Sequence, residues 1–125
     1  MNSMEQFSKM KYLNLETFRK SGQGMQTPVW FVQSGESLYV QTMANSGKFK
    51  RIRNNGQVNI APFRMDGKLT GTWVPAQARL VTDPELSTAA DRLLDQKYGL
   101  LKKIFSSQRA SKGAQDIILE INISG

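Results

Sequence analysis

The sequence predicts a mostly β fold, a small six-stranded antiparallel barrel, and three observations support this prediction. Six short segments are rich in β-forming residues, and turn residues separate them. Closing such strands into a barrel removes the exposed edges that would otherwise pair with other chains. The chain has 125 residues, of which 39% are hydrophobic and 22% charged. This length and composition indicate one globular domain, spanning residues 1–125.

The first three predicted strands form a meander. The first is Tyr12–Phe18, in which alternation places Leu13 and Leu15 on one face. The second and third are Met25–Gln33 and Ser37–Met43, and glycine-containing turns lie on either side of the second strand. Short turns of this kind favour antiparallel pairing of sequential strands.

A two-turn helix is predicted to interrupt the strands at Lys48–Asn54. Ser46 is a suitable N-cap, and Gly56 is expected to stop the helix at its C-terminal end. At about 100° per residue, Phe49 and Ile52 fall on one side of this helix. These two side chains are therefore expected to dock the helix onto the barrel.

Two further strands are predicted after the inserted helix. They cover Gln57–Arg64 and Leu69–Val81, and the turn Met65–Lys68 joins them. The turn contains an Asp-Gly pair, which is a strong hairpin indicator.

The C-terminal part predicts a helical hairpin and a sixth strand. Thr82 and Glu85 have the spacing of a capping box, so Thr82 is expected to cap a long helix. Gly99 is expected to divide this helix from a second arm at residues 100–105. The segment Ile117–Ile123 then predicts the last strand. Its alternate residues Ile117, Leu119, Ile121 and Ile123 lie on one face.

The composition excludes several kinds of chemistry. The chain contains neither cysteine nor histidine, so it has no disulfide, no Cys/His zinc site and no Ser-His-Asp or Cys-His catalytic group. No metal site is predicted, and no pair of carboxylates is placed for acid–base catalysis. No apolar run reaches the ~20 residues that cross a membrane, and we expect a cytoplasmic protein without a membrane partner.

The net charge of +7 suggests an anionic partner, and the cations concentrate on the inserted helix. Its N-terminus at Ser46 and Gly47 would present N–H groups and a partial positive charge, an arrangement suited to phosphate. A solvated basic face is the alternative interpretation, with about equal weight. The cations on this helix are Lys48, Lys50, Arg51 and Arg53.

Two aromatic segments are further candidates. Thr27–Phe31 places apolar side chains on both faces of a strand, so one face must meet a partner chain, a helix or a planar ligand. The long C-terminal helix is one possible cover for Trp30. In the other segment Gly71 stands close to Trp73, a combination that indicates either close approach of another group or a structural bulge.

Segments along most of the chain together resemble the pyridoxamine 5'-phosphate oxidase-like family of flavin-binding split β-barrels. The resemblance is greatest to the short branch that depends on the deazaflavin coenzyme F-420. The matching segments, in the order of the family, are Thr27–Phe31, Leu38–Thr42, Ser46–Asn54, Val58–Pro62, Gly71–Leu80 and Lys97–Leu100.

The resemblance implies a homodimer that binds its cofactor in a groove between the two subunits. It implies that Lys48, Lys50, Arg51 and Arg53 hold the anionic part of the cofactor, beside Ser46 and Gly47. The residues implied to line the ring system are Thr27, Pro28, Val29, Trp30, Gln41 and Thr42, and Trp73 is a further candidate for cofactor binding. No catalytic side chain is identified.

The resemblance also bears on which cofactor is expected. FMN-using oxidases tend to have Ser-Arg-Lys where this chain has Ser46, Gly47 and Lys48. The missing arginine favours the deazaflavin coenzyme F-420, and FMN is the alternative. The vitamin-processing oxidases use a C-terminal extension for their substrate, whereas this sequence ends at Gly125, so oxidation of pyridoxamine 5'-phosphate itself is not expected.

The leading hypothesis is an oxidoreductase that transfers hydride from a reduced deazaflavin to an unsaturated small molecule. An FMN-binding reductase on the same scaffold is the first alternative, and a noncatalytic flavin-binding protein is the second. A basic barrel that binds nucleic acid would stack bases on Trp30 and Tyr39. It ranks last, because the cations concentrate on the inserted helix rather than alternating with aromatic residues along a strand.

Overall fold

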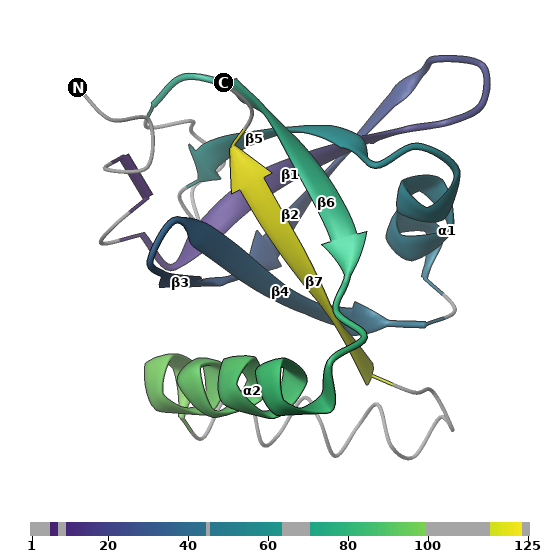
Figure 1. The fold of residues 1–125 in the computed structure, drawn as a ribbon. Helices are drawn as coiled ribbons and strands as arrows, with labels where there is room; N and C mark the ends of the chain where they lie inside the picture. Colours follow the sequence, from purple (N-terminus) through teal and green to yellow (C-terminus); the bar gives the residue numbers. More distant parts are fainter. Residues whose placement is uncertain (1–5, 8–9, 45, 64–70, 100–115, 124–125) are drawn as a thin grey trace.

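Seven strands and two helices make up the described part of the computed structural model, which covers residues 6–7, 10–44, 46–63, 71–99 and 116–123 (Figure 1). The strands are β1 (Tyr12–Phe18), β2 (Gly24–Trp30), β3 (Val32–Ser34), β4 (Ser37–Met43), β5 (Gln57–Phe63), β6 (Val74–Leu80) and β7 (Asp116–Ile123). The helices are α1 (Gly47–Asn54) and α2 (Pro84–Tyr98).

All seven strands belong to one curled antiparallel sheet, in the order β2-β1-β5-β6-β7-β4-β3. The two edge strands, β2 and β3, follow each other along the chain, and only Phe31 separates them. The sheet is therefore a half-barrel, split at Phe31.

The predicted mostly β class and the antiparallel arrangement are confirmed, whereas the strand count is wrong. The predicted strand Met25–Gln33 is two strands, because the chain leaves the β1 ladder after Trp30 and joins β4 at Val32. The predicted strand Leu69–Val81 begins as β6 only at Val74. The Met65–Lys68 turn and the second arm of the predicted helical hairpin, residues 100–105, lie outside the described residues.

The helix caps correct two predictions and confirm one. The Ser46 hydroxyl accepts a hydrogen bond from the N–H of Phe49, as expected of an N-cap. Gly56 is not the stop, since α1 ends at Asn54 and the extended residue Asn55 is its C-cap. In α2 the N-cap is Asp83, one residue after Thr82, and its carboxylate accepts from the N–H of Glu85.

Two hydrophobic clusters lie on opposite sides of the sheet. The larger one fills the half-barrel, and Phe49 and Ile52 of α1 belong to it. The second lies between the outer face of the sheet and α2, where Ala90 and Leu94 are fully buried. Figure 1 shows α2 lying across β4 and β7 on that face. Neither of the helices in the described ranges is long and apolar enough to cross a membrane.

Candidate functional site

Helix α1 lies at one end of the half-barrel (Figure 1). Phe49 and Ile52 are 7% and 5% exposed and join the central core, as their shared side of the helix predicts. The helix contacts β1 and β6. Docking by these two residues turns the polar and basic side of α1 away from the core.

The N-terminus of α1 is held by two hydroxyl groups. Thr42, the next-to-last residue of β4, is buried, and its Oγ1 lies 3.3 Å from the Oγ of Ser46. The Ser46 Oγ in turn accepts from the N–H of Phe49 at 3.2 Å. The end of β4 and the first turn of α1 are thereby fixed to each other, and the first N–H groups of a helix have no partner within it.

Arg51 points back toward this same end of the helix. Its Nε donates to the Oγ1 of Thr17, a fully buried residue of β1, over 2.6 Å. A Cβ atom at Gly47 would lie only 2.9 Å from the Arg51 Nη1. The glycine in the first turn therefore leaves the room that the guanidinium occupies, and a positive charge stands beside the helix N-terminus.

The other three cations of α1 lie around it without an acidic residue in the first turn. Lys50 and Arg53 are exposed, and the Arg53 guanidinium carbon lies 5.6 Å from the centre of the Phe49 ring. Lys48 is half-buried. The structure thus brings Thr42, Ser46, Gly47, Lys48 and Arg51 together at one helix end, and this group could bind a phosphate or another anion.

The predicted ring-lining residues of β2 spread along the strand. Thr27 pairs with Leu15 of β1, two positions from the pair between Thr17 and Met25 at the α1 end. Thr27 therefore lies on the side of the sheet where Arg51 reaches Thr17. Pro28 is exposed and Val29 is buried in the core.

The two tryptophans lie at the other end of the sheet. Trp30 pairs with Tyr12, which also pairs with Phe63 at the far end of β5. Trp73 immediately precedes Val74, the partner of Ile60. Tyr12 and Thr17 are five positions apart along β1, about 17 Å at the usual strand rise. Trp73 is likewise five positions from Ala78, whose N–H donates to the carbonyl of Gly56 just after α1. Within one protomer neither tryptophan therefore joins the α1 group.

Gln41 points to the opposite side of the sheet from its neighbour Thr42, as alternation along a strand requires. Its Nε2 donates to the Oδ1 of Asp91 in α2 at 3.3 Å, and it borders a pocket of about 280 Å³ beside that helix. Gln41 therefore contacts α2, and Thr42 alone of the pair reaches the α1 group.

Tyr98, the last residue of α2, organises the tryptophan end of the sheet. Its ring stacks on Trp30 with centroids 4.5 Å apart and planes 8° from parallel. Of the covers considered for Trp30, the long helix is the one that the structure shows. Burial raises the pKa of the Tyr98 phenol well above its ordinary value.

Two residues of these sites were not identified from the sequence. The sequence identifies Thr17 only as a residue of the first strand, because nothing nearby in the chain shows that an arginine 34 positions away would donate to its hydroxyl. Tyr98 belonged to a segment that matches the family, Lys97–Leu100, but its contact with Trp30 depends on how α2 packs.

Comparison with known proteins identifies the family. A family model described as pyridoxamine 5'-phosphate oxidase matches residues 3–123. The chain belongs to this family. Among curated proteins no sequence matches this chain.

Solved structures show that this pyridoxamine 5'-phosphate oxidase-family chain shares its fold with proteins of different described roles. The heme storage protein HutZ from Vibrio cholerae aligns with a TM-score of 0.76 and 17% identity, covering 97% of this chain and 87% of that one. A FAD-binding protein from Mesorhizobium loti aligns with a TM-score of 0.70 and 17% identity, covering 100% of this chain and 90% of that one. An F-420 reductase aligns with a TM-score of 0.65 and 16% identity, covering 100% of this chain and 95% of that one.

Proposed function

We propose that this pyridoxamine 5'-phosphate oxidase-family protein is an oxidoreductase that binds a flavin-type cofactor by its anionic part at the N-terminus of α1. The observation that carries the proposal is the convergence of Ser46, Gly47 and Arg51 at this one helix end, with Lys48 in the same first turn. Family membership supplies the flavin-binding scaffold around it.

The residues present are suited to an anionic cofactor. Hydrogen bonds between charged groups and phosphate oxygens are short and strong, and a lysine and an arginine offer several donors. Glycine at position 47 leaves room for the Arg51 guanidinium beside the first turn of α1, so its charge can meet an anion at this helix end. Within this proposal Lys48 and Arg51 bind the anion, while Lys50 and Arg53 attract it from solution.

The deazaflavin coenzyme F-420 is the leading cofactor and FMN the alternative. Glycine at position 47, where the FMN-using oxidases tend to have arginine, favours the deazaflavin, and a solved F-420 reductase shares the fold. When bound, such a cofactor supplies a hydride for an unsaturated small molecule. The protein contributes binding, orientation and electrostatics.

A flavin-type cofactor is favoured over heme, although a heme storage protein has the same fold. Histidine and cysteine are the axial ligands that heme proteins most often use. The sequence contains neither. A noncatalytic flavin-binding protein remains the alternative, and it would bind the cofactor without turning over any substrate.

We further propose that two chains form a homodimer with the cofactor between them. In one protomer the basic end of the half-barrel and the tryptophan end are about 17 Å apart, and in the proposed dimer the second subunit would supply its own residues beside α1. β2 is a sheet edge whose Gln26 and Pro28 are exposed. Sedimentation should show a dimer at micromolar concentration, and a stable monomer would rule out the shared groove.

The test of the cofactor site is a titration with F-420, FMN and heme, followed by absorption spectra. Lys48→Ala should weaken binding of the preferred flavin-type cofactor by roughly ten- to a hundredfold, the scale of a lost hydrogen bond to a charged group. Arg92→Ala is the matched control, since it removes one exposed positive charge from α2. Equal affinities of wild type, Lys48→Ala and Arg92→Ala would withdraw the site, and tight heme binding without flavin binding would withdraw the cofactor assignment.

A further inference from the structure

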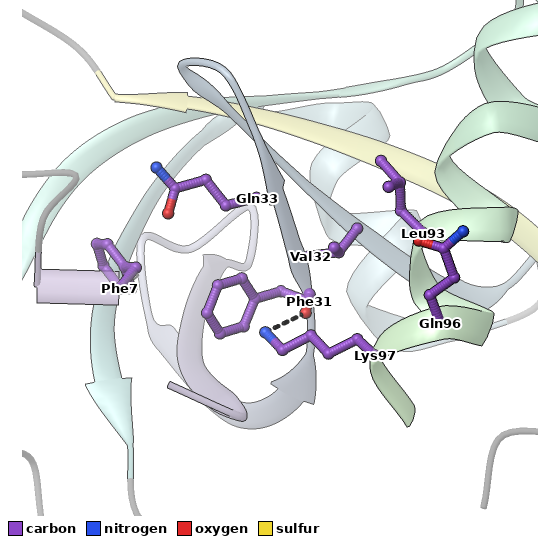
Figure 2. A pocket seen from close by; sticks show the side chains of 7 residues that line it. All are labelled: Phe7, Phe31, Val32, Gln33, Leu93, Gln96 and Lys97. Atoms are coloured by element: carbon purple, nitrogen blue, oxygen red, sulfur yellow. Dashed lines mark hydrogen bonds between the residues drawn. The ribbon is translucent and has the colours of Figure 1, made fainter. Parts of the chain in front are cut away.

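A second pocket lies between the β2–β3 junction and the C-terminal part of α2 (Figure 2). Its volume of about 410 Å³ falls within the range of small-molecule sites, about 300–1,000 Å³. One wall is apolar, the rim carries two amide side chains, and among the described lining residues the amine of Lys97 is the single charged group. The lining residues are Phe7, Phe31, Val32, Gln33, Leu93, Gln96 and Lys97.

The amine of Lys97 is held against Phe31 by two contacts. Its Nζ donates to the Phe31 carbonyl at 2.8 Å, the bond drawn in Figure 2, and lies 3.8 Å from the centre of the Phe31 ring. Figure 2 shows the side chain extending from α2 toward that ring. The position of the charge is therefore fixed, although much of the side chain's surface is exposed.

No acidic residue of the described ranges forms an ion pair with Lys97, in contrast to Arg79, which pairs with Glu120. Its contacts are a carbonyl and the faces of two rings, those of Phe31 and Tyr98. Partial burial lowers the pKa of Lys97 to about 8, which means that its surroundings disfavour the positive charge. An anion in the pocket would supply an opposite charge and accept hydrogen bonds from the remaining N–H groups of the Lys97 amine.

The apolar wall specifies what the rest of the ligand must be. Phe7 and Phe31 meet edge to face with ring centres 6.1 Å apart and are themselves buried, so they lie beneath the pocket, and Leu93 is the partly exposed apolar residue of its lining. We propose that this pocket binds a small apolar molecule carrying one carboxylate, with its apolar part against Leu93 and its carboxylate on Lys97. Gln33 and Gln96 are the remaining polar groups at the rim.

Within one protomer this site is separate from the anion site on α1. The pocket belongs to the β2–β3 junction, next to Trp30 and its partner Tyr12, whereas α1 contacts the Thr17 end of β1. The inference therefore does not depend on which cofactor α1 binds, or on whether it binds one.

The experiment is calorimetric titration with 2-naphthoate and with 2-naphthamide, which has the same rings and no charge. Wild type should bind the acid at least tenfold more tightly than the amide. Lys97→Met keeps the length of the side chain without its charge, and should weaken acid binding by roughly ten- to a hundredfold. Lys97→Arg should retain the preference for the acid.

Two control variants test where on the protein 2-naphthoate binds. Arg92→Ala removes an exposed charge elsewhere on α2, and Lys48→Ala removes one from α1, and both should bind 2-naphthoate as wild type does. The proposal is overturned if wild type binds the two probes equally or binds neither. It is also overturned if Lys48→Ala loses as much affinity as Lys97→Met. If Lys97→Met does not fold, the wild-type comparison of acid with amide and the Lys97→Arg titration still decide the question.

Discussion

The phenol oxygen of Tyr98 accepts a hydrogen bond from the backbone N–H of Phe31 over 2.9 Å. The same oxygen lies 2.7 Å from the carbonyl of Phe31 and 2.6 Å from the carbonyl of Lys11, either of which can take its single proton. Phe31 is the residue between β2 and β3, where the sheet ladder does not supply partners. The end of α2 thus satisfies the backbone at the split in the barrel.

Tyr98→Phe should destabilise the protein by about 1–3 kcal/mol, because it leaves the Phe31 N–H without its acceptor and preserves the ring stacked on Trp30. Tyr98→Leu should cost more, since the stacking is lost as well. The measurement is chemical denaturation of the two variants and wild type. A Tyr98→Phe variant within about 0.5 kcal/mol of wild type would show that the hydroxyl does not matter.

Phe49→Ala should lower the free energy of unfolding by about 3–5 kcal/mol, the cost of removing a phenylalanine from a core. Lys50→Ala is the matched control, because the adjacent lysine is exposed and its loss should change stability by less than about 0.5 kcal/mol. Thermal melts of the two variants compare them. Similar losses in both would contradict the docking of α1 through Phe49.

The cap of α2 gives a prediction that separates two neighbouring residues. Asp83→Ala should cost about 1 kcal/mol, because the N–H of Glu85 loses the carboxylate that accepts from it. Thr82→Ala should stay within about 0.5 kcal/mol, since Thr82 is exposed and does not cap the helix. Denaturation curves with the larger loss at Thr82→Ala would restore the capping box expected from the sequence.

Lys97 should make stability rise with pH above about 8. Its pKa is about 8 in the folded protein and near the ordinary 10.5 when unfolded, so between these values the unfolded chain binds more protons. Above about pH 10 the raised pKa of Tyr98 acts in the opposite direction, because only the unfolded phenol ionises.

The measurement for Lys97 is denaturant unfolding from pH 7 to pH 11 of wild type and Lys97→Met. The free energy of wild type minus that of the variant should increase between about pH 8 and 10.5, and the contribution of Tyr98 should cancel in this difference. A difference that stays flat over this range would mean that the folded and unfolded states hold the lysine proton equally.

The sequence was most informative where structure depends on near neighbours. Helix α1 was predicted with its N-cap and its docking side, because Ser46, Phe49 and Ile52 lie within seven residues and follow one helical period. The strands β1 and β4 were predicted at their observed bounds for the same reason, since alternation and flanking turns define them.

The break at Phe31 could not be predicted, because apolar residues continue through it and the tyrosine that bonds to its backbone is 67 positions away. The candidate site divides in the same way. The α1 residues come together through local structure, whereas Trp30, Gln41 and Trp73 lie where sheet register and helix packing put them. Composition alone gave no indication of the pocket beside Lys97.

The contact between Tyr98 and Phe31 also affects the order in which parts of the protein can fold. The β1–β2 hairpin closes between Phe18 and Gly24, and the cap of α1 joins residues only three apart. The corner at Phe31 requires closure of a far longer loop, which costs more entropy and slows formation. The amide proton of Phe31 should consequently report α2 docking, because it can exchange with solvent only when the Tyr98 oxygen leaves it.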